Sequence, residues 1–293
     1  MTESDRLAEG FEQNRTRLRA VAYRMLGSFA EADDAVQEAW LRATRSDAGA
    51  VDNLGAWLTT IVARVCLNVL RSRRTRGEEP LDAHVPDLVI GRIDAADPEE
   101  EALMADSVGL ALLVVLETLT PAERLAFVLH DMFDLPFDEI APMVGRSPAT
   151  ARQLASRARR RVRGAEAPDP DLGRQRQVVD AFYAAARCGD FDALVELLHP
   201  DVVMRADGGT ARPEASVVVH GAADVARQAL RFHQPAAVAR PALVNGAAGI
   251  VFTVDGRPIA VVAVTVSDDR IVGIDALADP DRLLALDLSV LDR

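Results

Sequence analysis

Residues 119–163 have the sequence LTPAERLAFVLHDMFDLPFDEIAPMVGRSPATARQLASRARRRVR, and this stretch predicts three helices separated by tight turns. The first helix begins at Pro121, because Thr120 can cap it and Glu123 can complete a capping box. Apolar residues then recur at helical spacing until Asp134-Leu135-Pro136 breaks the pattern.

A second and a third helix follow within the same stretch. The second, PFDEIAPMVG, has apolar residues four apart and ends at Gly145, a residue type that tolerates the left-handed backbone found after many helices. Ser147 then caps the third helix, which begins at Pro148. A short helix, a glycine turn and a capped helix in this order predict a helix-turn-helix.

The third helix is strongly basic. It carries six arginines between Arg152 and Arg163 and no acid, and its first turns are small and polar. Short side chains let a helix enter the major groove of DNA, where Arg and Gln can bond base edges while further arginines meet phosphates. The alternative is a solvated basic helix end, which the helix dipole favours. The helix-turn-helix context favours DNA binding, and the candidate contacts are Ser147, Thr150, Arg152, Gln153, Arg157, Arg159 and Arg160.

The chain as a whole is acidic. It has 45 Asp and Glu against 33 basic residues, which gives a net charge of −12. Residues 121–165 carry 8 Arg and 5 acids, whereas residues 81–120 have a net charge of −8 and residues 166–293 a net charge of −7. Because an acidic chain repels phosphates, we expect DNA binding to need a partner protein.

Residues 30–44 predict an amphipathic helix with an apolar stripe of mostly alanine side chains. On periodicity alone, the opposite face is most simply a solvated surface. Four polar residues lie off the apolar stripe: Asp33, Asp34, Gln37 and Glu38.

Residues 54–76 predict a helix that ends basic, with five arginines and no acid from Arg64 to Arg76. An aromatic residue among polar and basic ones suits single-stranded DNA, in which bases stack on rings and phosphates meet arginine. A single tryptophan on a helix more often belongs to the core, so this pattern is weak by itself. The candidate surface comprises Trp57, Thr60, Arg64, Asn68, Arg71, Arg73 and Arg74.

The rest of the chain predicts linkers and a separate α+β domain. Acidic residues 77–106 predict a linker, 107–118 a buried helix and 164–173 a second linker. Helices are expected at 174–187, 190–198 and 222–233, and strands at 201–207 and 214–220. The last four β-like runs, at 236–244, 247–254, 258–267 and 270–277, predict an antiparallel meander because turn residues separate them.

Three motifs in register resemble the extracytoplasmic-function (ECF) sigma factors of the sigma-70 family. DDAVQEAWLRA, residues 33–43, resembles the family helix that docks on the clamp helices of the RNA polymerase β′ subunit. Residues 56–76 resemble the stretch that melts and reads the −10 promoter element, and residues 119–162 the region that reads the −35 element. The resemblance implies a non-catalytic initiation subunit with a region 2 domain at 6–76 and a region 4 domain at 107–165.

The remaining part, residues 174–285, resembles a SnoaL-like domain of the NTF2-like superfamily, as in the sigma-J-like group. There the tail contacts the sigma domains and regulates them in cis, in place of a separate anti-sigma factor. Asp207-Gly208-Gly209 matches the start of a glycine-rich motif of that group, although Thr210-Ala211-Arg212 departs from it. Residues 278–283 resemble a second motif, and the implied cis-regulatory residues there are Asp279, Pro280, Asp281 and Arg282. The implied fold is two all-α domains followed by an α+β cone.

Two other functions compete with this interpretation. Related cone folds include cyclases and isomerases, so the tail could be an enzyme or could bind a small ligand. Catalysis needs an acid and a base that converge on one cavity, and the spacing of the candidates shows no such convergence. A stand-alone repressor would leave residues 6–76 unexplained. The candidate acids and bases are Tyr183, His199, Asp207, His220, Asp224 and His233.

The composition also sets expectations about location and cofactors. The polar N-terminus MTESDRLAEG lacks the apolar core of a signal peptide, and we expect a cytoplasmic protein with no membrane partner. No metal-ligand cluster or phosphate-binding glycine loop is evident, so no cofactor is expected. Cys66 and Cys188 are far apart in apolar helical patterns, which favours structural thiols.

Overall fold

The computed structural model describes residues 3–46, 53–76, 83–91, 109–163, 169–232 and 236–291. The chain forms two compact units. The first comprises Met1–Glu79 and Val115–Gly164, and the second comprises Pro80–Val114 and Ala165–Arg293. The chain between the two helical parts of the first unit therefore belongs to the second unit.

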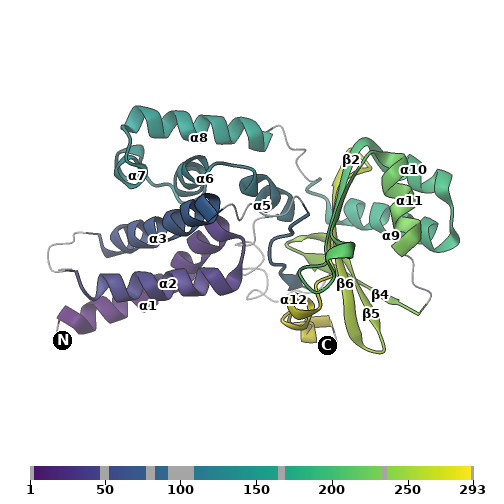
Figure 1. Ribbon diagram of the computed structural model, residues 1–293, viewed down its shortest axis with the longest axis horizontal. Helices are drawn as coiled ribbons and strands as arrows, with labels where there is room; N and C mark the ends of the chain where they lie inside the picture. Colours follow the sequence, from purple (N-terminus) through teal and green to yellow (C-terminus); the bar gives the residue numbers. More distant parts are fainter. Residues whose placement is uncertain are drawn as a thin grey trace. The chain divides into compact units, whose positions relative to one another are not determined.

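The first unit begins with three packed helices, α1 (Glu3–Leu26), α2 (Phe29–Ala43) and α3 (Leu54–Arg76), which lie together in Figure 1. Gly27 has a φ of 79°, which ends α1 and separates it from α2. The predicted alanine stripe of α2 is buried. Small side chains there let the helices approach closely, and larger ones such as Leu18 and Leu58 fill the core.

Helix α3 is the helix of the described residues that is long and apolar enough to cross a membrane. Its apolar face is nevertheless buried by α1 and α2, with Leu58, Val62 and Cys66 inside the bundle. Burial raises the pKa of the Cys66 thiol to about 12, which keeps it protonated and unreactive at neutral pH. The length and apolar composition of α3 are therefore those of a core helix of the bundle.

The second part of the first unit is the predicted helix-turn-helix. Helices α6 (Pro121–Phe127), α7 (Phe137–Val144) and α8 (Pro148–Arg163) follow the expected boundaries, and α5 (Leu110–Glu117) precedes them. The capping box of Thr120 and Glu123 is formed. Gly145 has a φ of 67° and turns the chain between α7 and α8. The first helix is longer than α6 alone, because a π-helical turn, η1 (Val128–Met132), continues it.

Two buried arginines connect α6 with α1. The Arg124 Nε donates to the carbonyl of Arg24 at 3.3 Å, at the end of α1 where helix carbonyls lack internal partners. The Arg24 guanidinium lies 5.0 Å from the ring centroid of Phe133, just after η1. Burial lowers the pKa of Arg124 to about 10, so it remains charged at neutral pH. The Arg24 carbonyl and the charges of Glu117 and Glu31 offset part of this burial.

The second unit is built on one sheet with the strand order β1-β4-β5-β6-β7-β2-β3. Strands β4 to β7 form the predicted antiparallel meander, and β2 pairs with β7 in parallel. Strand β2 begins at Leu198, three residues before its predicted start, and β3 begins at Val217, three residues after its predicted start. The strands are β2 (Leu198–Asp207), β3 (Val217–His220), β4 (Val238–Val244), β5 (Ala247–Val254), β6 (Arg257–Ser267) and β7 (Arg270–Leu277).

Helices cover one face of this sheet, and the sequence explains which face. Alternate residues of β2, Val202, Met204 and Ala206, point into an apolar core with Val178 of α9 and Val225 of α11. Figure 1 shows these helices together on one side of the strands. They are α9 (Leu172–Cys188), α10 (Phe191–Leu197) and α11 (Ala222–Phe232). The predicted α+β cone of the tail is confirmed, as are the two all-α parts before it.

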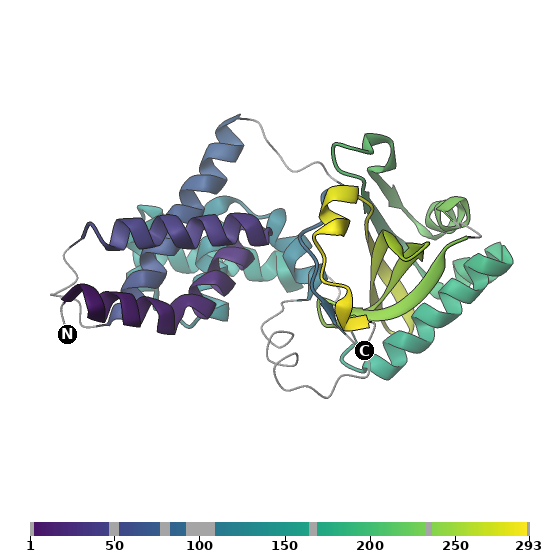
Figure 2. The same ribbon diagram turned by 90° about the horizontal axis from the view of Figure 1, so that it is seen from below.

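The linker supplies an unpredicted edge strand to this sheet. Residues 83–91, expected to be a linker without regular structure, run along the second unit and end in β1 (Ile90–Gly91), which pairs with β4. The C-terminal α12 (Pro280–Leu284) and η3 (Ser289–Leu291) lie beside this segment in Figure 2, and η3 contacts β1. The tail therefore folds together with part of the linker.

Loss of the α6 capping box gives a test of this local structure. We expect Thr120→Ala to lower the free energy of unfolding by about 1 kcal/mol, because the main-chain N–H of Glu123 loses its acceptor. Chemical denaturation of the purified protein measures the change, and Thr120→Ser should remain close to wild type because it keeps the hydroxyl. Equal stability of the Ala and Ser variants would show that the cap contributes nothing.

Candidate functional site

The exposed face of α8 is set by its alanines. Ala151, Ala155 and Ala158 are fully buried against the rest of the helix-turn-helix. At about 100° per residue, the opposite side of the helix then carries Gln153 and Arg160, which are both exposed. Arg157 and Arg163 flank this line and are exposed as well, so a helix face rich in donors faces outward.

Two arginines of α8 instead brace the domain. Arg159 bonds Asp131 of η1 at 2.5 Å, and its side chain is only one-third exposed. Arg161 bonds the buried Glu123 at 3.1 Å, which ties α8 to the cap of α6. Of the predicted contacts, Arg159 is thus placed on the domain side of the helix.

The N-terminal end of α8 presents the remaining predicted residues. The hydroxyls of Ser147 and Thr150 are 3.0 Å apart, and the Thr150 N–H donates to the Ser147 hydroxyl at 3.3 Å. Both lie at the first turn beside Arg152, whose guanidinium lies 5.3 Å from the ring centroid of Phe137. The helix end that would enter a groove is therefore small, polar and capped.

Helix α3 brings most of its predicted residues onto one side. Trp57, Arg64, Asn68 and Arg71 are spaced by seven, four and three, so they lie along a single stripe, and the last three are exposed. Thr60 is beside this stripe, with its hydroxyl donating to the Ala56 carbonyl at 3.0 Å. The stripe can present an aromatic edge followed by amide and guanidinium donors.

Two further arginines of α3 lie off that stripe. Arg73 is on the opposite side of the helix and forms an ion pair with Glu31 of α2. Arg74 is exposed, about a quarter turn from the stripe. Arg73 therefore contributes to the packing of α3 on α2, and the candidate DNA surface consists of the other residues.

The polar face of α2 is accessible along its length. Asp33 pairs with Arg19 of α1 at 2.7 Å, and Glu38 pairs with Arg42 at 2.8 Å. Asp34 and Gln37, between them, are exposed. All four predicted residues share this surface, with two carboxylates already near arginines.

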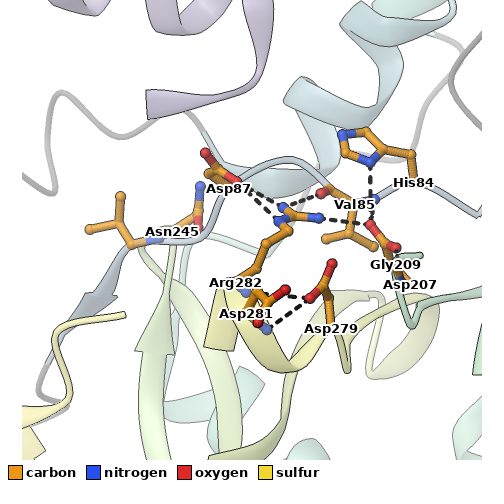
Figure 3. Close-up of polar contacts among 10 residues, drawn as sticks. His84, Val85, Asp87, Asp207, Gly209, Asn245, Asp279, Asp281 and Arg282 are labelled. Carbon is orange, nitrogen blue, oxygen red and sulfur yellow. Dashed lines mark hydrogen bonds and ion pairs between the residues drawn. The ribbon is translucent and has the colours of Figure 1, made fainter. Parts of the chain in front are cut away.

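The tail motifs meet at a buried carboxylate, which Figure 3 shows. Asp207, at the end of β2, is only 4% exposed. Its Oδ2 accepts from the Val85 N–H at 3.0 Å and from Arg282 Nη1 at 2.7 Å, and its Oδ1 accepts from the Gly209 N–H at 3.0 Å. His84 Nδ1 lies 3.2 Å from the same carboxylate. The linker, β2 and the C-terminal helix thus share one acid.

Arg282 makes the second set of contacts to the linker. Its Nη2 donates to the Val85 carbonyl at 2.6 Å and to Asp87 Oδ1 at 2.9 Å, and its Nε lies 3.2 Å from the same Asp87 oxygen. One guanidinium thereby joins a linker carboxylate, a linker carbonyl and the Asp207 carboxylate. This planar, multidentate arrangement suits arginine and would not suit a point charge such as lysine.

Gly209 and Asp279 bring the two tail motifs together. A Cβ at Gly209, which has a φ of 63°, would overlap the Asp279 carboxylate, so only glycine fits there. Asp279 in turn caps α12, accepting from the N–H groups of Asp281 and Arg282. Pro280 begins that helix, and Gly208 is buried where a Cβ would overlap the carbonyl of Arg212. All seven predicted cis-regulatory residues therefore lie around the linker contact.

We call this site the linker clamp, formed by His84, Val85, Asp87, Val89, Asp207, Gly209, Asn245, Asp279 and Arg282. Asn245 was not predicted. Its N–H donates to the Val89 carbonyl and its Oδ1 accepts from the Val89 N–H, both at 2.9 Å. Asn245 has a φ of 49° in the turn before Gly246, and only the turn was visible in the sequence.

The Asp207 carboxylate of the clamp is charged across the physiological pH range. Burial alone would raise the pKa of the Asp207 carboxyl, but hydrogen bonds from His84, Val85 and Gly209 and the charge of Arg282 lower this pKa to about 2. A depressed carboxyl pKa stabilises the folded state above the unfolded value near 3.8, and this stabilisation is lost as pH falls through about 2. The Asp207 carboxyl therefore stays ionised near neutrality.

The candidate acids and bases of the enzyme hypothesis do not converge in the described part of the tail. His199 and Asp207 lie at opposite ends of β2, and Asp224 forms an ion pair with Arg227 on the surface of α11. Tyr183 packs its ring against Phe252 in the core, and His220 is exposed. His233 lies outside the described residues. Among the residues that the structure describes, no group of three His, Cys, Asp or Glu could hold a metal ion.

Removal of Arg282 should open the clamp. We expect Arg282→Ala to release residues 83–91, because Asp207 and Asp87 are left close together without their shared cation. Hydrogen exchange of the Val85 and Val89 amides should become faster, most clearly at Val85. Arg257→Ala, an exposed arginine in the same domain, is the matched control. Unchanged exchange at Val85 in the Arg282 variant would contradict the proposed role of this contact.

Comparisons with known proteins agree with this geometry. Residues 11–76 match Sigma-70 region 2 and residues 109–162 match Sigma-70, region 4. The ECF RNA polymerase sigma factor SigJ of Mycobacterium tuberculosis (strain ATCC 25618 / H37Rv) is 42% identical over 287 residues, which cover 93% of this chain and 91% of SigJ. The probable ECF sigma factor SigI of the same strain is 35% identical over 97% of each chain.

A solved structure extends the similarity to the whole chain. The crystal structure of the Mycobacterium tuberculosis sigma factor SigJ matches with a TM-score of 0.72 and 38% identity, covering 96% of this chain and 99% of that one. The helical parts, the linker and the tail are therefore shared with a relative of similar length. The chain belongs to the ECF RNA polymerase sigma factors of the sigma-70 family, with an additional C-terminal α+β domain.

Proposed function

We propose that this sigma factor is regulated in cis by its own C-terminal domain, which holds the linker between the two DNA-reading parts. Sigma factors direct RNA polymerase to promoters, and the membership of this chain in the family carries that general function. The cis-regulation rests on one observation: residues 83–91 are folded into the C-terminal domain through the linker clamp.

The clamp restricts the freedom of the linker. The chain from residue 77 to residue 109 connects α3 with α5. Within its described segment 83–91, Asp207, Arg282 and Asn245 bind Val85, Asp87 and Val89. The −10 and −35 elements are roughly 25 base pairs apart by their names, which is about 85 Å along the duplex. The −10-reading and −35-reading parts must span this distance together on one promoter. A domain bound to the linker between them therefore affects promoter engagement.

The C-terminal domain thereby takes the place of a separate anti-sigma factor. The domain has two effects. The clamp holds residues 83–91 in one conformation, and the attached domain stabilises the connection between α3 and α5. We infer no enzymatic activity for the domain, because its candidate acids and bases are dispersed over the described residues. The site of action is the cytoplasm, where polymerase and promoter DNA are its partners.

The two effects can be separated by truncation. We expect removal of residues 279–293 to raise promoter activity, because Arg282 is lost while the Asn245 bonds and β1 pairing remain. Removal of residues 173–293 should lower activity, because the brace is lost. Transcription with core polymerase at matched protein concentration measures both, and Arg282→Ala in the full chain should behave as the short truncation does. Equal activity of all four proteins would show that the tail is not regulatory.

The exposed face of α8 predicts different consequences for neighbouring arginines. We expect Arg160→Ala to weaken promoter binding and to reduce the slope of log affinity against log salt by about one, without a change in thermal stability. Arg159→Ala should instead lower the unfolding midpoint, because the ion pair with Asp131 is lost. The same salt slope for both arginine variants would contradict this division.

Replacing Gln153 with Ala should relax sequence preference at the −35 element by about 1–3 kcal/mol.

The polar face of α2 predicts the contact with polymerase. We expect charge reversal at Asp34 and Glu38 to reduce capture of core polymerase, because the proposed surface for the β′ clamp helices changes sign. Reversal at Glu9, an exposed acid of α1, is the control. Circular dichroism should show unchanged helix content in both proteins. Full capture of core enzyme by the folded Asp34 and Glu38 variant would place the contact elsewhere.

A further inference from the structure

The ring of Phe137 on α7 lies against Arg152 on α8, a candidate for reading a base. Phe137 is the first residue of α7, and its ring centroid is 5.3 Å from the Arg152 guanidinium carbon on α8. Arg152 is exposed, on the flank of the outward face of α8, so its side chain has few other neighbours to restrict it. This distance is within the range of a cation–π contact.

The ring of Phe137 also packs against the ring of His130. The His130 and Phe137 ring centroids are 3.9 Å apart, with an interplanar angle of 32°. His130 Nδ1 lies 2.9 Å from the Leu135 carbonyl oxygen, which can only accept, so Nδ1 carries the proton. This bond spans the turn between η1 and α7 and ties the histidine ring to the backbone. The three side chains form a stack that begins on the backbone and ends at Arg152.

We propose that Phe137 is a positioning residue that holds Arg152 in the orientation needed to read a base. A bidentate bond from arginine to guanine requires one orientation of a flexible side chain. A guanidinium that already lies on a ring loses less conformational freedom when DNA binds. Among the residues that the structure describes, no aromatic ring lies against the other exposed donors, Gln153, Arg157 and Arg160, so the effect is confined to Arg152.

This inference rests on the proposed reading of the −35 element by α8, and the test separates the two. Full-length protein is assembled with core polymerase and first selects DNA from a library in which both promoter elements are randomised. In a second library, the selected −10 element is kept and only the −35 positions are randomised. DNA bound from this second library is sequenced for wild type, Arg152→Ala, Phe137→Leu, Phe137→Tyr and the double variant Phe137→Leu with Arg152→Ala.

We expect Arg152→Ala to remove base preference at one −35 position and Phe137→Leu to weaken preference at that same position by about threefold to fivefold. Phe137→Tyr keeps the ring and should retain the wild-type preference, while the double variant should match Arg152→Ala. Equal weakening at every position in Phe137→Leu would show a general structural role and overturn the proposal. If Arg152→Ala left every position unchanged, base reading by Arg152 would fail, and its positioning by Phe137 with it.

Discussion

The hold of the C-terminal domain on the linker depends on the Asp207 carboxylate. This single buried charge accepts from the linker backbone at Val85 and from Arg282, which itself binds Asp87. Three segments that are distant in the sequence are thereby joined at one point. Because a buried carboxylate is costly without its donors, the three segments stabilise one another and should separate together.

The arginines of the helical unit divide into two groups by their partners. Arg73, Arg159 and Arg161 lie next to carboxylates and connect neighbouring helices, whereas Arg64, Arg157 and Arg160 are exposed. The first group pairs with acids of the fold, and the second is left for the proposed contacts with phosphates and bases. A count of positive residues therefore overestimates the DNA-binding surface, since the function of each arginine depends on what faces it.

The acidity of the chain is consistent with a subunit that acts within a larger enzyme. A net charge of −12 opposes an approach to DNA, although α8 presents a basic face. The polar face of α2 is the proposed surface for polymerase, and the proposed regulation acts on the connection between the DNA-reading parts. Promoter engagement then depends on assembly and linker freedom, and the charge of the free protein counts for less.

The sequence by itself determined the local structure and the family. The capping box at Thr120, the turn at Gly145 and the alternating strands of the meander were predictable because each depends on residues a few positions apart. The paired tail motifs were recognised by resemblance, but their partner was not. Only the tertiary structure decided that the linker supplies a strand beside β4, since Ile90 and Val244 are joined by backbone bonds that leave no local pattern. It also decided that Arg73 faces Glu31 and that Asn245 holds Val89, because such contacts arise when distant segments pack.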